Sequence, residues 1–142
     1  MFVRDILKVK GSKVYSINPD TMLSDVVDRL VSHNCGSLVV RNEAGDMIGI
    51  VTERDILKAC AAKVGLLHEL STEKYMSTRL VTGLPDETIA VVMGRMTEKR
   101  IRHLPIMENG KLAGMVSIGD IVKAQHQQLS VENHYLKNYI QS

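Results

Sequence analysis

Residues 49–59, GIVTERDILKA, return 65 positions later as residues 114–124, GMVSIGDIVKA. Six of the eleven residues are identical and three more are conservative exchanges. A period of this length lets 142 residues hold two copies of one supersecondary unit and little else, so the repeat decides the architecture. It also places Thr52-x-x-Asp55 and Ser117-x-x-Asp120 at equivalent points, which makes these pairs the first candidates for a functional site.

Apolar spacing and turn residues predict one order of elements for both copies. In the first copy we expect a strand at 13–17, a helix from Thr21, strands at 37–41 and 47–51, and a helix from Thr52. In the second copy we expect a strand at 80–83, a helix at 88–99, strands at 104–107 and 111–116, and a helix from Ser117. Because one such βαββα unit leaves a sheet face uncovered, an α/β (α+β) fold of two repeats, packed through their sheets about a pseudo-twofold axis, is predicted.

The remaining segments lie at the ends and between the copies. Residues 2–9 predict a short helix packed on the other half, and residues 62–77 join the repeats. The tail at 125–140 continues the last helix with apolar residues that suggest a second subunit. We expect the first repeat with its N-terminal helix in residues 1–70, and the second with its helical tail in residues 71–142.

Composition narrows the class of protein. Hydrophobic residues make up 44% of the chain, which is enough for a packed core. The net charge of only +2 gives weak general attraction to nucleic acid or membranes. There is no apolar run of membrane-span length and no signal-peptide pattern, and Cys35 and Cys60 are isolated. We expect a soluble cytoplasmic protein with reduced thiols.

The doubled pattern G-h-h-[ST]-x-x-D-[IL] (h apolar), the Pro-Asp turn before each first helix, and Arg102-His103-Leu104-Pro105 resemble a tandem pair of cystathionine-β-synthase-type (CBS) domains, a Bateman module. The resemblance covers about residues 3–124 and points to the stand-alone prokaryotic members. It implies a regulatory module that binds adenosine-containing ligands (AMP, ADP, ATP, NADH or S-adenosylmethionine) in a cleft between the repeats. It also implies a homodimer of modules.

The resemblance assigns ribose to Asp55 and Asp120 and phosphate to Thr52 and Ser117. The residue types suit these roles, because a carboxylate can accept hydrogen bonds from two vicinal hydroxyls. A helix start with a hydroxyl cap also presents N–H groups that attract phosphate. The other interpretation is a capping box, in which the acidic side chain only ties back to the helix start. Capping and ligand binding are compatible, so both stay open.

The basic run KRIRH at residues 99–103 is the second lead. The resemblance assigns phosphate contacts to Arg102 and His103, whereas the first two residues of the run fit a solvated helix end equally well. The equivalent stretch of the first copy has no Arg or Lys, and that copy instead has Arg54 where the second has Gly119. We therefore expect unequal pockets, with the Ser117 pocket better supplied for a phosphate chain.

Adenine needs an apolar slot and backbone hydrogen bonds. The opening strands offer both, at Tyr15, Ser16 and Ile17 in the first copy and at Val81 and Thr82 in the second. The same residues also fit an ordinary half-buried strand.

Other chemistry has no support in the sequence. The five histidines share no metal spacing with carboxylates or thiols, and neither cysteine has a recognisable base. We expect a sensor of energy or redox state that binds an adenosine nucleotide as its ligand, uses no catalytic cofactor and is not an enzyme. The alternative is a ligand-free structural or adaptor dimer that acts through protein–protein contacts; membrane and nucleic-acid partners are not expected.

Overall fold

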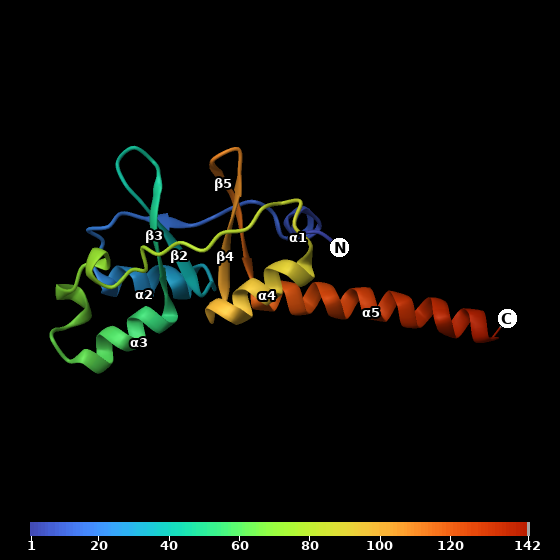
Figure 1. The fold of residues 1–142 in the computed structure, drawn as a ribbon. Helices are drawn as coiled ribbons and strands as arrows, with labels where there is room; N and C mark the ends of the chain where they lie inside the picture. Colours follow the sequence, from blue (N-terminus) through green and yellow to red (C-terminus); the bar gives the residue numbers. More distant parts are fainter. Residues whose placement is uncertain (142) are drawn as a thin grey trace. The chain divides into compact units, whose positions relative to one another are not determined.

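The computed structural model describes residues 1–141, which form two units (Figure 1). The first-repeat unit is Val14–Val81, and the second-repeat unit combines Met1–Lys13 with the chain from Thr82 onward. The predicted N-terminal helix thus belongs with the second repeat. The repeat boundary at residues 70 and 71 stays a prediction.

The first-repeat unit is a small sheet with helices packed against it. Its elements in chain order are β1 (Ser16–Ile17), α2 (Leu23–Ser32), β2 (Ser37–Arg41), β3 (Met47–Thr52), α3 (Glu53–Ala62), and the 3-10 helices η1 (Leu67–Glu69) and η2 (Thr72–Lys74). The strand order is β1-β2-β3, with β1 parallel and β3 antiparallel to β2. Leu23, Val26 and Leu30 recur at helical spacing on α2, and this apolar face is buried against the sheet.

The second-repeat unit repeats this order with one strand fewer. Its elements are α1 (Val3–Lys10), α4 (Ile89–Lys99), β4 (His103–Glu108), β5 (Lys111–Ser117) and α5 (Ile118–Gln141). The strand predicted at 80–83 is wrong: only a single parallel bridge between Gly83 and Ile106 remains, beside the antiparallel β4–β5 hairpin. The strand predicted at 13–17 is likewise shorter, since β1 has two residues. The α/β class with two related repeats is confirmed.

Pro105 explains the lost strand. In the first repeat the Val39 N–H donates to the Tyr15 carbonyl at 3.1 Å and extends the pairing of β1 with β2. Pro105 stands 66 positions later, in the place of Val39, and has no N–H to donate. The parallel pairing in the second-repeat unit therefore stops at Gly83, whose N–H and carbonyl both bond to β4.

Two short segments dock on the repeats by the same backbone bonds. Val3 N–H donates to the Glu87 carbonyl at 2.9 Å, and Thr72 N–H donates to the Thr21 carbonyl at 2.9 Å. The backbone hydrogen bonds on either side of these two also have a counterpart in the other repeat. Residues 1–4 thus complete the second repeat as residues 70–73 complete the first. The prediction that the N-terminal helix packs on the other half is confirmed by its contacts with β5 and α5.

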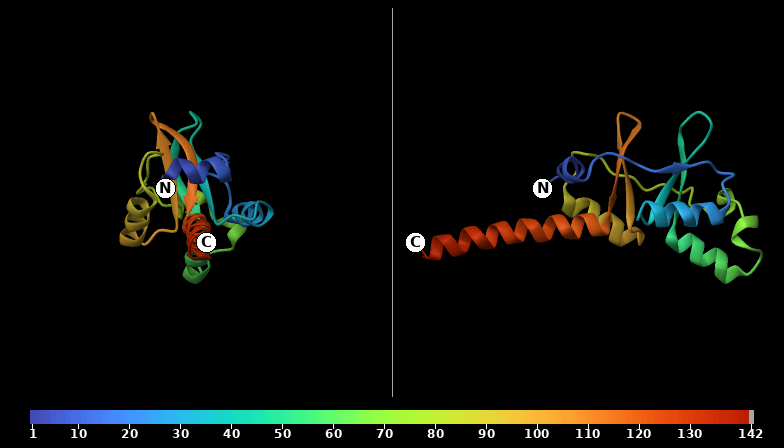
Figure 2. Two further views of the ribbon diagram at one scale, coloured as in Figure 1. Left: turned by 90° about the vertical axis from the view of Figure 1, so that its right-hand side faces the viewer. Right: turned by 180° about the vertical axis from the view of Figure 1, so that it is seen from behind.

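The C-terminal half of α5 runs out past the other elements of its unit (Figures 1 and 2). From residue 126 onward every described residue is exposed. The exposed residues include large apolar side chains, at Leu129, Val131, Tyr135, Leu136, Tyr139 and Ile140. A face of this kind is typical of a helix that packs on another molecule.

Candidate functional site

Thr52 and Asp55 form a complete helix cap at the junction of β3 and α3. The Asp55 N–H donates to Thr52 Oγ1 at 3.4 Å, and Asp55 Oδ2 accepts from the Thr52 N–H at 2.8 Å. The Thr52 hydroxyl also donates to Asp55 Oδ2 at 3.2 Å. The capping interpretation is confirmed here, because both members satisfy backbone groups of the helix start.

Ser117 and Asp120 form the matching cap at the start of α5. The Asp120 N–H donates to Ser117 Oγ at 3.1 Å, and Asp120 Oδ2 accepts from the Ser117 N–H at 2.8 Å. In both caps the hydrogen bonds to the carboxylate end on Oδ2, and within residues 1–141 none ends on Oδ1. Among the described residues, each cap thus leaves one carboxylate oxygen without a hydrogen bond.

Strand register brings the basic residues of the second repeat next to its cap. His103 pairs with Ser117 across the β4–β5 hairpin, and the Ile118 N–H donates to the Arg102 carbonyl at 3.0 Å. The exposed Arg102 and half-buried His103 thus begin the strand that adjoins the start of α5. The predicted set Arg102, His103, Ser117 and Asp120 is brought together.

The same register in the first repeat brings different residues to the cap. Ser37 pairs with Thr52, and the Glu53 N–H donates to the Gly36 carbonyl at 3.1 Å. Gly36 and Ser37 carry no charge where the second repeat has Arg102 and His103. Arg54 is exposed on the first turn of α3 and makes no ion pair within the described chain.

Lys10 reaches Asp120 from the last turn of α1, which sequence analysis did not foresee. Its Nζ lies 2.6 Å from Asp120 Oδ2 and donates to the Met115 carbonyl at 2.8 Å. The two side chains are 35% and 25% exposed, so the ion pair is only partly shielded from water. Within residues 1–141 Asp55 has no such cation, which makes the two caps electrostatically different.

The Asp120 carboxyl has a lowered pKa. Burial raises the pKa of its carboxyl, but hydrogen bonds from the Lys10 ammonium and the Ser117 N–H outweigh burial. The net shift of the Asp120 pKa is downward, so the side chain is a carboxylate at neutral pH.

The adenine candidates of the first repeat lie along β1. The half-buried Tyr15 ring stacks on the His33 ring, with centroids 3.6 Å apart and planes 12° from parallel. The Ser16 carbonyl accepts from Arg29 at 3.3 Å, and the Ile17 side chain is buried in the hydrophobic core. Of the three residues, Tyr15 has a side chain suited to contact a base, and His33 already covers one face of its ring.

The adenine candidates of the second repeat lie in the segment that lost its strand. Arg95 donates to the Thr82 carbonyl at 3.0 Å and forms a bidentate pair with Glu87, at 2.8 and 2.5 Å. This pair fixes the backbone at Thr82 and occupies its carbonyl. Val81, the last residue of the other unit, is half-buried.

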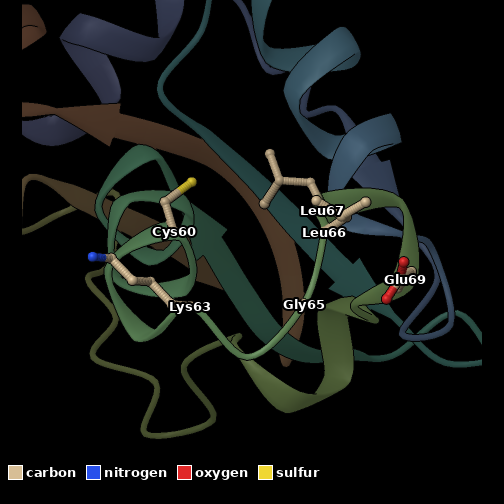
Figure 3. Close-up of a pocket in the computed structure, with 6 residues that line it drawn as sticks. All are labelled: Cys60, Lys63, Gly65, Leu66, Leu67 and Glu69. Carbon is tan, nitrogen blue, oxygen red and sulfur yellow. The ribbon is translucent and has the colours of Figure 1, made fainter.

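The first-repeat unit has a hollow that none of the candidate residues above lines. It has a volume of about 480 Å³ at the C-terminal end of α3 (Figure 3). It is lined by Cys60, Lys63, Gly65, Leu66, Leu67 and Glu69. No three His, Cys, Asp or Glu side chains within residues 1–141 are grouped so that they could hold a metal ion. None of the described helices is both long and apolar enough to cross a membrane.

Sequence reasoning missed two contacts of the candidate residues, Lys10 on Asp120 and His33 on Tyr15. The helix prediction for residues 2–9 put a basic segment on the second repeat, but its register on β5 cannot be read from spacing. The His33 contact depends on where α2 ends, since His33 is its C-cap residue.

The chain is similar to known proteins of one family. The model of the CBS domain matches residues 3–62 and again residues 72–127. The mitochondrial CBS domain-containing protein CBSX3 of Arabidopsis thaliana is 34% identical over 98% of this chain and 71% of its own length.

Solved structures share the fold. A CBS-domain-containing protein from Agrobacterium tumefaciens has a TM-score of 0.85 and 39% identity, over 87% of this chain and 92% of that chain. The CBS domain pair of protein MJ0100, determined in complex with 5′-methylthioadenosine and S-adenosylmethionine, has a TM-score of 0.80 over 90% of this chain and 98% of that chain. At 24% identity it shows likeness of fold alone. The doubled cap and the two family matches agree: the chain belongs to the CBS domain family, as a tandem pair.

Proposed function

We propose that the chain is a cytoplasmic regulatory module that binds an adenosine-containing nucleotide and is not an enzyme. AMP, ADP and ATP are the first candidates, with NADH and S-adenosylmethionine next. The ligand's ribose hydroxyls bond to Asp120 and Asp55. Its phosphates meet the helix start at Ser117 with Arg102 and His103, or the helix start at Thr52 with Arg54.

The observation that carries this proposal is the cap geometry, which is the same in both repeats. Each carboxylate is fixed by hydrogen bonds to Oδ2 and keeps Oδ1 for a donor from outside. A sugar hydroxyl is such a donor, and a fixed acceptor loses little entropy when it binds one.

The charges nearby favour an anionic ligand at the second repeat. Arg102 and His103 border the start of α5, whose first N–H groups attract negative charge. Their equivalents in the first repeat are neutral. A protein of the same fold, MJ0100, holds two adenosine compounds, which supports adenosine as the common part of the ligand.

A panel of ligands tests the proposal. AMP, ADP, ATP, NADH and S-adenosylmethionine are each titrated by calorimetry and by thermal shift, because a ligand of the folded state raises its melting temperature. Asp120→Asn keeps an oxygen for the cap and removes the charge, so affinity should fall about ten- to a hundredfold, which corresponds to about 1.5–3 kcal/mol for a charged hydrogen bond.

Asp28→Asn, on the exposed face of α2, is the matched control and should bind as the wild type does. A panel in which no compound binds at millimolar concentration would overturn the proposal. So would equal affinities for wild type and for Asp120→Asn and Asp55→Asn together.

A second function, that of a homodimer or adaptor, is favoured by the exposed apolar side chains of α5. Leu129 and Leu136 are 58% and 59% exposed and lie seven residues apart, on one side of the helix. Leu129→Glu with Leu136→Glu should abolish self-association in sedimentation experiments without lowering the melting temperature of the monomer. Val9→Glu, on α1 and 84% exposed, is the control. A wild-type chain that sediments as a monomer at high concentration would exclude the dimer.

A further inference from the structure

The Lys10 ammonium occupies a defined position on the edge of β5. In the first repeat the equivalent edge carbonyl, that of Ile50, accepts from the Ser77 N–H at 2.9 Å. In the second repeat the docked segment is α1, which is still helical where the first repeat has Ser77, so its backbone N–H is not free to donate. The Met115 carbonyl accepts from Lys10 Nζ instead. The lysine therefore takes the place of a backbone donor, and this bond brings its ammonium to Asp120.

Asp120 Oδ2 has no further capacity in this arrangement. It accepts from Lys10 Nζ at 2.6 Å and from the Ser117 N–H at 2.8 Å, and a carboxylate oxygen offers about two lone pairs. A ribose diol that bonds to both oxygens of the carboxylate thus needs one donor to leave. The Ser117 N–H is fixed in the backbone of the cap. Lys10, on a flexible four-carbon stem, is the donor that can move.

The first repeat lacks this obstacle. Asp55 Oδ2 also accepts two hydrogen bonds, but the second comes from the Thr52 hydroxyl. That hydroxyl is neutral and can turn away without moving the backbone. The two carboxylates therefore differ in what a ligand has to displace.

We propose that Lys10 competes with the ligand's ribose for Asp120, so that ligand binding at the second-repeat cap releases the C-terminal end of α1. The inference rests on the proposed function, in which Asp120 binds ribose. Because of this competition, the Asp120 site binds a diol more weakly than the same site would without Lys10. By linkage, a partner that pulls α1 away from β5 strengthens ligand binding by the same factor.

The test compares AMP affinities in variants of the full chain. All variants carry Asp55→Asn, so that the heat of titration reports the second repeat. Lys10→Met removes the ammonium and keeps the length of the side chain, and it should tighten AMP binding about three- to tenfold, as expected for a partly exposed ion pair. Lys8→Met, exposed on the same helix, is the matched control and should leave affinity unchanged.

Two further readouts separate competition from a merely structural role of Lys10. With 2′-deoxy-AMP, which has no diol, the gain from Lys10→Met should shrink to less than twofold. In the wild type, AMP should increase acylation of the Lys10 amine by a water-soluble reagent. A gain of equal size with both nucleotides, or protection of Lys10 by AMP, would overturn the competition.

The carboxyl titration of Asp120, followed by carbon NMR without ligand, distinguishes failure of the competition from failure of the proposed function. Lys10→Met should raise the Asp120 pKa, and an unchanged pKa would show that the ion pair is absent. AMP binding that is equal or weaker in Lys10→Met overturns the competition and leaves the proposed function intact. If neither AMP nor any other compound of the panel binds to any variant while the titration still reports the ion pair, the proposed function fails and the competition fails with it.

Discussion

Gly114 of β5 lies directly against Leu7 of α1: a Cβ atom on Gly114 would be 2.7 Å from Leu7 Cδ2. The first repeat has the same relationship between Gly49 and Met76, whose Sδ would be 2.7 Å from an added Cβ. The glycine that opens the repeated sequence pattern is therefore required because the side chain of the docked segment, Leu7 or Met76, lies directly against it. This contact also holds α1 in the register that brings Lys10 to Asp120.

Gly114→Ala should destabilise the second-repeat unit by about 1–3 kcal/mol, because the Leu7 side chain has to shift in a packed site. Combining it with Leu7→Ala, which makes room for the new methyl group, should cost less than the sum of the two single changes. Urea unfolding of the four proteins measures this coupling. Gly94→Ala is the control: nothing lies within 4 Å of its added Cβ, so it should stabilise α4 by up to about 1 kcal/mol. If the losses of stability from Gly114→Ala and Leu7→Ala simply add in the double variant, the contact between Gly114 and Leu7 is contradicted.

The Glu87–Arg95 pair should make stability depend on acid pH. Its hydrogen bonds lower the pKa of the Glu87 carboxyl, against an opposing effect of burial. Because the folded-state pKa is below the unfolded value of about 4.3, the ionised side chain stabilises the fold above pH 4.3. This contribution is lost as the pH falls through the lowered folded-state pKa.

Glu87→Gln should therefore cost about 1–3 kcal/mol at neutral pH, as expected for a charged hydrogen bond, and should flatten the fall in stability between pH 5 and 3. The free energy of unfolding in urea at several pH values measures both effects. Glu98→Gln, exposed on the same helix as Arg95, should follow the wild-type curve. Equal slopes for Glu87→Gln and the wild type would count against the pair.

Thr52→Ala should lower the free energy of unfolding by about 1 kcal/mol, since it removes the hydroxyl that caps α3. Ser117→Ala should cost a similar amount at α5. Thr97→Ala is the control, because that exposed hydroxyl only bonds back to the Met93 carbonyl within α4. If neither cap variant is less stable than the control, the hydroxyls serve the ligand alone.

His33→Ala should cost about 0.5–1 kcal/mol through loss of the stack on Tyr15. It should also change the near-UV circular dichroism of tyrosine, because it uncovers a ring face. His68→Ala, exposed in the same unit and without a ring contact among the described residues, is the control. Identical spectra for wild type and His33→Ala would contradict the stacking.

The repeat made most of the fold predictable, because an element that is predicted in one copy is also predicted at the equivalent position of the other copy. Helix starts at Thr52 and Ser117 and the β2–β3 hairpin agree with the structure to within a residue. The strand at 80–83 failed because the prediction relied on similarity to the first copy. Pro105 breaks that similarity because it lacks the backbone N–H that Val39 donates in the first copy. The loss of this one hydrogen bond outweighs the similarity of the two sequences.

The candidate site was predictable where it is local in sequence. Both caps join residues three apart, and spacing alone indicates such a contact. Lys10 and Asp120 are 110 residues apart, and their meeting depends on how α1 docks on β5. No pattern within either copy contains that information. The assignments of ribose, phosphate and adenine to particular residues stay predictions.

The docking of residues 1–4 on the second repeat has a consequence for synthesis on the ribosome. The first repeat is completed by residues 70–73, which emerge directly after it, so this half can fold early. The second repeat is completed by residues 1–4, which precede the first repeat in the sequence and have to stay undocked until residues 85–89 have been translated. A change that removes the docking of residues 1–4 would therefore damage the second repeat and spare the first.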